Sequence, residues 1–157
     1  MMMGGAWQSA MKDAISEVLE TMFFVMVDFE EDAELDRPYE CGSRIQLRNG
    51  ERRVEISFMA TYSFARTITA NLLAMDEEEV EAEDLDDMMK ELANMIGGNF
   101  QARIEESGWL LGIPAIESTG ERPLQGEAME FSCFGEPSGA VALQFHASGG
   151  AVQEMMG

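Results

Sequence analysis

Two polar residues on one predicted helix are candidates for chemistry, Glu91 and Asn94. They are three positions apart, so on a helix of 3.6 residues per turn their side chains are neighbours on one face. We expect that face to be exposed, because the apolar side chains of the helix fall on its other side, namely Leu85, Met88, Met89, Leu92, Ile96 and Phe100. The pair would present a carboxylate and an amide to a visiting molecule.

The same segment contains residues that weaken a helix. Asparagine is a poor residue inside a helix, because its side chain competes for backbone hydrogen bonds. The pair Gly97-Gly98 costs about 1 kcal/mol per glycine relative to alanine. Such costs have a reason in packing or function, and we expect the glycines to let another backbone approach closely. Asn99 falls towards the apolar side and is expected to be buried, with hydrogen bonds to backbone.

The hydrophobic pattern predicts the elements that position this helix. The predicted helices are 6–24, 63–75 and 84–106, the last with Asp84 as its N-cap. The predicted strands are 23–29, 44–48, 52–59, 109–116 (an edge strand or extended loop, because it contains Pro114), 127–134 and 140–146. Hairpin turns are expected at Asn49-Gly50 and across residues 136–139. The sequence thus predicts an α+β fold with helices on one face of a mostly antiparallel sheet.

The chain length and the loops predict one domain. A chain of 157 residues fits a single domain over 1–157, and we expect residues 1–5 and 148–157 to be frayed. The acidic segments 30–42 and 76–83 are interpreted as a loop and a solvated connection. The acidic runs 28–36 and 76–87 lack the central glycine and the ligand spacing of an EF-hand calcium site, so solvated loops are the favoured interpretation.

The charge of the chain limits its partners. Lys and Arg total 10 and Asp and Glu total 30, giving a net charge of −20. Nucleic acid and anionic membrane surfaces are therefore unlikely partners, and a basic patch on another protein is a better one. The alternative, that the acidic residues only keep the protein soluble, stays open.

Other residue types give weaker signals. Cys41 and Cys133 form no Cys/His cluster, so no metal site is predicted, and two free thiols fit a reducing cytoplasm. No signal peptide or membrane span is recognised, which also favours a cytoplasmic location. His146 could join Ser132 or Ser148 in a catalytic triad, but no nucleophile motif surrounds either serine. A structural role for His146 is the favoured interpretation.

The run Glu91-Leu-Ala-Asn94-Met-Ile-Gly-Gly98-Asn99 resembles the signature of the CheC/CheX chemotaxis phosphatases. The order of the predicted elements and the later Gly112-Ile-Pro114 stretch are similar to that family as well. The resemblance implies a phosphatase, a hydrolase that removes the phosphoryl group from the aspartate of a CheY-like response regulator. It implies that Asn94 orients the attacking water and that Glu91 pairs with a lysine of the partner. The response regulator would supply magnesium, so no cofactor of the chain's own is expected.

The resemblance also suggests how many sites the chain has. Some members of the family carry two such motifs, on related helices. Here Glu17 aligns with Glu91, but Glu20 replaces Asn94, which argues for one site, as in the CheX branch. The resemblance implies that single-site members form homodimers through the edges of their sheets, so a homodimer is expected here. The alternative function is a non-catalytic module that docks a receiver domain or a flagellar-switch partner through the same helix face.

Overall fold

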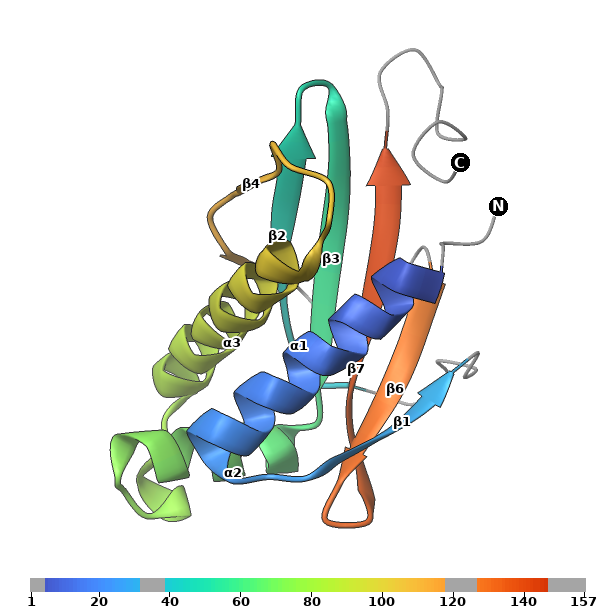
Figure 1. Cartoon of the computed structure of the whole chain (residues 1–157). Coiled ribbons are helices and arrows are strands. Elements are labelled where there is room, and N and C mark those ends of the chain that lie inside the picture. The colour runs from blue at the N-terminus through green and yellow to red at the C-terminus, as the bar shows by residue number, and fades with distance from the viewer. Residues whose placement is uncertain (1–4, 32–38, 118–126, 147–157) are drawn as a thin grey trace.

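The computed structural model describes residues 5–31, 39–117 and 127–146. It confirms the α+β class: helices lie across one face of a single antiparallel sheet (Figure 1). The helices are α1 (Gly5–Phe23), α2 (Tyr62–Leu73) and α3 (Ala82–Arg103), with a 3₁₀ turn η1 (Glu77–Glu79). The strands are β1 (Val27–Glu31), β2 (Cys41–Asn49), β3 (Arg52–Ala60), β4 (Leu110–Leu111), β5 (Ala115–Ile116), β6 (Glu127–Cys133) and β7 (Glu136–His146).

The sheet places α3 near one of its edges. The strand order is β1-β6-β7-β3-β2-β4, and β5 also pairs with β2. The segment around Pro114 therefore forms two short edge strands, as predicted, because proline cannot donate to a ladder. Helix α3 packs over β2 and against α1, so its outer flank borders the β4–β5 edge (Figure 1).

The core lies between the helices and the sheet. Alternate residues of β2 and β3 point into it, and they include Ile45, Leu47, Val54, Ile56 and Phe58. The N-terminal turn of α1 contributes Trp7, whose ring contacts Phe100, Trp109 and Phe145 edge-on at 5.2–5.6 Å between centroids. These contacts tie the end of α3 to α1 and to the segment that follows α3.

The first hairpin forms as predicted, with its turn one residue later. Asn49 pairs with Arg52, so the two loop residues are Gly50 and Glu51. Gly50 has φ 64°, a value that glycine adopts without steric cost. The alternation of β3, with Val54, Ile56 and Phe58 inward, is confirmed.

One predicted strand start and both predicted ends of α3 are wrong. The strand predicted at 23–29 begins only at Val27, because Phe23 still belongs to α1 and Phe24 takes φ 57°, which ends the helix. Helix α3 begins at Ala82 instead of Asp84 and ends at Arg103 instead of Glu106. Asp84 is its third residue, and the Asp84 carboxylate accepts a hydrogen bond from the Glu81 amide at 2.9 Å.

The turn predicted across residues 136–139 is also wrong. The β6–β7 turn is Phe134-Gly135, where both residues have positive φ (58° and 75°), as a tight two-residue hairpin requires. Pro137 belongs to β7, beside a register shift in β6. The predicted fraying of residues 1–4 and 148–157 falls outside the described residues, whereas Gly5 starts α1.

Candidate functional site

The structure places Glu91 and Asn94 on the exposed face of α3, in the middle of the helix. Within the part of the chain that the structure describes, neither side chain has a hydrogen-bond or ion-pair partner. An unpartnered amide and carboxylate, one turn apart on a rigid helix, are ready to contact another molecule.

Helix α3 is fixed to the sheet directly beneath this pair. The buried Ser43 hydroxyl on β2 donates a hydrogen bond to the Met89 carbonyl of α3, at 2.7 Å. Two turns later the buried Gly97 lies against side chains: a methyl group at this position would be 3.2 Å from Ile45 Cγ2 and 3.1 Å from Leu111 Cδ1. The missing side chain at Gly97 thus leaves room for two side chains, and the expectation that it lets another backbone approach is wrong.

Gly98 is looser than its neighbour. A methyl group there would lie 3.8 Å from Leu111 Cδ2, which is ordinary van der Waals contact. Close packing therefore accounts for Gly97 and leaves Gly98, one turn beyond Asn94 on the exposed side, without a packing reason.

The segment after α3 lies beside the candidate pair, a feature that the sequence analysis missed. Strand β4 pairs with Leu47-Arg48 of β2 and β5 pairs with Ser43-Arg44. Gln101 of α3 donates a hydrogen bond to the Trp109 carbonyl at 2.6 Å. Asn94 precedes Gln101 by seven residues, or two turns, so both belong to the flank of α3 that borders this segment.

The prediction for Asn99 is wrong in its partners. Asn99 is half-buried, and its amide donates to the Glu17 carboxylate at 2.9 Å, while its carbonyl accepts from Arg103 Nε at 2.6 Å. Arg103 also forms an ion pair with Glu17. The hydrogen bond from Asn99, followed by the hydrogen bond and charge of Arg103, lowers the pKa of Glu17. Asn99 therefore joins α3 to α1 through side chains, and among the described residues its side chain makes no hydrogen bond to backbone.

The described residues support neither the catalytic triad with Ser132 nor a reactive cysteine. Ser132 pairs with Pro137, nine residues from His146 along β7, or about 30 Å at 3.3 Å per residue. Ser148 lies outside the described residues. Burial raises the pKa of the Cys41 and Cys133 thiols to about 11, so neither is a thiolate at neutral pH.

The described ranges offer neither a cluster of metal ligands nor a membrane-spanning helix. Residues 5–31, 39–117 and 127–146 contain no group of three or more His, Cys, Asp or Glu side chains that could hold a metal ion. No helix among them combines the length and apolar character that crossing a membrane requires.

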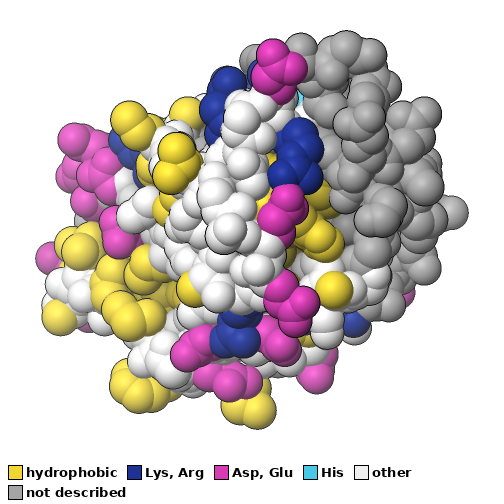
Figure 2. Space-filling model, turned by 45° about the horizontal axis from the view of Figure 1, so that its top comes forward, with side chains coloured by type: hydrophobic (Ala, Val, Ile, Leu, Met, Phe, Trp, Pro, Cys, Tyr) yellow, Lys and Arg dark blue, Asp and Glu magenta, His cyan; other side chains and the backbone are white. Residues whose placement is uncertain are grey.

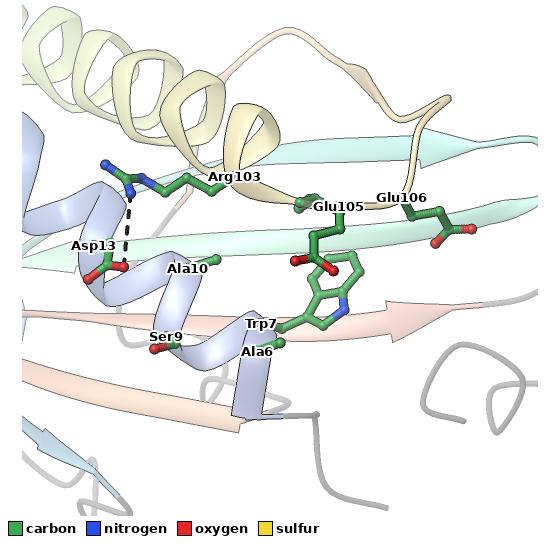
Figure 3. A pocket seen from close by; sticks show the side chains of 9 residues that line it. Ala6, Trp7, Ser9, Ala10, Asp13, Arg103, Glu105 and Glu106 are labelled. Atoms are coloured by element: carbon green, nitrogen blue, oxygen red, sulfur yellow. Dashed lines mark ion pairs between the residues drawn. The ribbon is translucent and has the colours of Figure 1, made fainter.

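A groove of about 570 Å³ opens at the other end of α3 (Figure 3). It lies between the start of α1 and the end of α3, with Trp7 at one side and Arg103 at the other, 3.9 Å from Asp13. Arg103 is nine residues, or about 13 Å along the helix, from Asn94. The groove is therefore separate from the exposed pair and contains no nucleophile that a base activates.

Comparison with solved structures identifies the fold. The CheX chemotaxis protein of Vibrio vulnificus superposes with a TM-score of 0.73 at 18% identity, covering 89% of this chain and 99% of that one. A CheX from Borrelia burgdorferi, solved as a complex with CheY, BeF₃ and Mg²⁺, gives 0.68 at 15% identity, covering 89% and 97%. The middle domain of FliM from Vibrio alginolyticus gives 0.62 at 7% identity, covering 96% and 97%.

Sequence comparison identifies the family. No curated protein matches the chain in sequence. The family model of the chemotaxis phosphatase CheX matches residues 42–134, more than half of the 157 residues and a span that includes all of α3. The resemblance drawn from the motif of α3 is thereby confirmed, and the chain belongs to the CheX chemotaxis phosphatase family.

Proposed function

We propose that this protein removes the phosphoryl group from the aspartate of a CheY-like response regulator. The observation that carries the proposal is the exposed and unpartnered Glu91–Asn94 pair on α3, within the span that matches the family. The structure of a relative in complex with CheY supports a partner of the same kind. Such a partner is cytoplasmic, and the same location is proposed for this protein.

The proposed reaction needs little from this chain except position. A water oxygen bonds to phosphorus while the bond from phosphorus to the aspartyl oxygen breaks, leaving a free carboxylate and inorganic phosphate, which with solvent takes up the water proton. Phosphoryl transfer of this kind depends on alignment and charge stabilisation. The Asn94 carbonyl would accept a hydrogen bond from the water, and its neutral amide adds no negative charge beside the phosphoryl group.

Glu91 has a different role in the proposal. One turn from Asn94, its carboxylate would pair with a lysine of the response regulator and fix the angle at which α3 enters the partner's site. Magnesium would enter with the response regulator.

A homodimer joined at sheet edges remains a prediction. Light scattering at the protein concentration of the assay measures the molecular mass and so tests it.

The test is the lifetime of a phosphorylated receiver. The CheY protein encoded in the same genome is phosphorylated by transfer from a radiolabelled acyl phosphate such as acetyl phosphate, and loss of the label from CheY is followed in magnesium buffer with and without this protein. A clearly shortened lifetime supports the proposal. If the lifetime is unchanged while the phosphorylated receiver is retained on immobilised protein, the non-catalytic docking module replaces the enzyme.

A further inference from the structure

The segment that borders the candidate pair is exposed and apolar. Its side chains Ile113, Leu110 and Ile116 are 90%, 70% and 40% exposed. The run 110–116, Leu-Leu-Gly-Ile-Pro-Ala-Ile, contains no charged residue, in a chain where charged residues make up 25%. We name residues 110–116 the edge strip. Exposed apolar side chains on adjoining positions are typical of surfaces that contact another protein.

The edge strip runs alongside the turns of α3 that carry the pair. At one end, Leu111 reaches the helix at Gly97. At the other end, Ile116 pairs with Ser43, and Ser43 bonds to the Met89 carbonyl of α3. The strip therefore spans α3 from Met89 to Gly97, the stretch that contains both Glu91 and Asn94. Figure 2 shows hydrophobic side chains exposed on the left, the side on which α3 and β4 lie in Figure 1.

The strip is held in place from below. The Gly112 amide donates to the Gln46 carbonyl at 2.8 Å, and the Glu117 amide donates to the Gly42 carbonyl at 3.1 Å. At its start, the buried Trp109 contacts the Trp7 ring edge-on, and the Arg52 guanidinium lies over the Trp109 ring, 5.1 Å from its centroid. Because these contacts fix the backbone, the exposed side chains can contact a partner with little loss of conformational entropy.

We propose that the edge strip is the apolar half of the docking surface, and that its occupant is the receiver domain whose phospho-aspartate meets Asn94. This inference rests on the proposed function. A partner that brings its phosphoryl group within hydrogen-bond reach of Asn94 must also cover the surface beside that flank of α3. The strip is that surface, and it is continuous with the pair.

The charge of the two proteins gives the strip a reason to be apolar. This chain carries a net charge of −20, and a phosphorylated aspartate adds negative charge to the partner's site. Apart from Glu91, which would pair with a lysine of the partner, further carboxylates near the phosphoryl group would be repelled by it. Burial of Leu110 and Ile113 supplies affinity that does not depend on charge.

The test separates binding from hydrolysis. The same CheY, labelled with a fluorophore and activated with BeF₃⁻ and Mg²⁺, is titrated with the wild type and with the double variant Leu110→Ser/Ile113→Ser. We expect the Kd to rise roughly tenfold or more, because the variant loses apolar area that Leu110 and Ile113 would bury against the receiver. In the decay assay the KM should rise equally while kcat at saturation stays unchanged, because Asn94 is intact.

Met26→Ser is the matched control. Met26 is as exposed as the strip residues, at 76%, but it precedes β1 at the opposite edge of the sheet. Its Kd should equal that of the wild type. Circular dichroism confirms that each variant is folded.

Three results would overturn the inference. A wild-type protein that hydrolyses or binds the receiver, with an unchanged Kd in the double variant, rejects the edge strip and leaves the proposed function standing. A fall in molecular mass by light scattering that accompanies the loss of affinity assigns the strip to self-association between copies. A wild-type protein that neither binds nor hydrolyses rejects both proposals.

Discussion

Helices α1 and α3 lie side by side on the sheet and carry the same spacing of polar residues, yet the two pairs have different surroundings (Figure 1). On α3, Glu91 and Asn94 are exposed and have no partner among the described residues. On α1, Glu17 is held by Asn99 and Arg103 of α3, and the position that matches Asn94 is Glu20. Spacing alone therefore does not make a site: a candidate pair must also be free of internal partners.

The largest expected effect comes from giving α3 the pattern of α1. Asn94→Glu places a carboxylate where the proposal needs a neutral amide, so it repels the phosphoryl group and loses the water contact. We expect turnover in the decay assay to fall by at least about 100-fold, the usual cost of losing one well-placed polar contact in a transition state. The reverse change, Glu20→Asn on α1, should add no activity to the wild type or to Asn94→Glu, because Glu17 is engaged with α3. A gain from Glu20→Asn would mean that α1 carries a second working site.

The second-largest effect is the difference in kcat/KM between substitutions of Glu91 and of Glu17. Glu91→Ala removes the proposed pairing with the partner's lysine, and we expect kcat/KM to fall roughly tenfold, or about 1.4 kcal/mol. Glu17→Ala should leave kcat/KM unchanged, since its partners belong to this chain. Steady-state kinetics on both variants measures the difference, and equal losses would remove the distinction between the helices.

The adjacent glycines of α3 sharpen the comparison further. Gly98→Ala should raise the free energy of unfolding by up to about 1 kcal/mol, because alanine favours the helix and its methyl group has room. Gly97→Ala gains the same helix propensity but forces Ile45 and Leu111 to move, so we expect it to be less stable than Gly98→Ala by about 1 kcal/mol or more. Urea denaturation measures both values. Equal stabilities would show that Ile45 and Leu111 can move away from position 97 without a loss of stability.

The smallest expected effect concerns pH. The Asn99 hydrogen bond and the Arg103 charge hold the pKa of Glu17 below its ordinary value. Its stabilising effect is therefore fully present above the ordinary glutamate pKa and disappears as pH falls through the lowered pKa. The melting temperature of Glu17→Gln should be slightly below that of the wild type at neutral pH and should converge with it in strong acid. The effect is small because the group is exposed, and a difference that grows on acidification would contradict this assignment.

The sequence predicted the features that depend on periodicity. The helix bearing Glu91 and Asn94, its exposed face and the first hairpin all follow from apolar spacing or turn residues, and the structure confirms them. Two boundaries failed where a residue with positive φ ended an element. Phe24 and Phe134 adopt that conformation, and nothing in a phenylalanine marks it in advance, so the strand start and the second turn were predicted wrongly.

The surroundings of the pair could not be predicted, because they depend on contacts distant in sequence. Asn99 bonds to Glu17, 82 residues away, and only the packing of α3 on α1 brings them together. The position of residues 110–116 beside α3 depends on pairing with β2. The apolar, uncharged run was visible in the sequence, but its nearness to Asn94 was not.

The most direct test of the central claim is Asn94→Ala beside the wild type, with the same phosphorylated CheY. We expect the wild type to shorten the lifetime of the phosphoryl group. Asn94→Ala should leave that lifetime near the spontaneous value and bind the BeF₃⁻-activated receiver with an unchanged Kd. An Asn94→Ala protein that hydrolyses as fast as the wild type would show that Asn94 does not orient the attacking water.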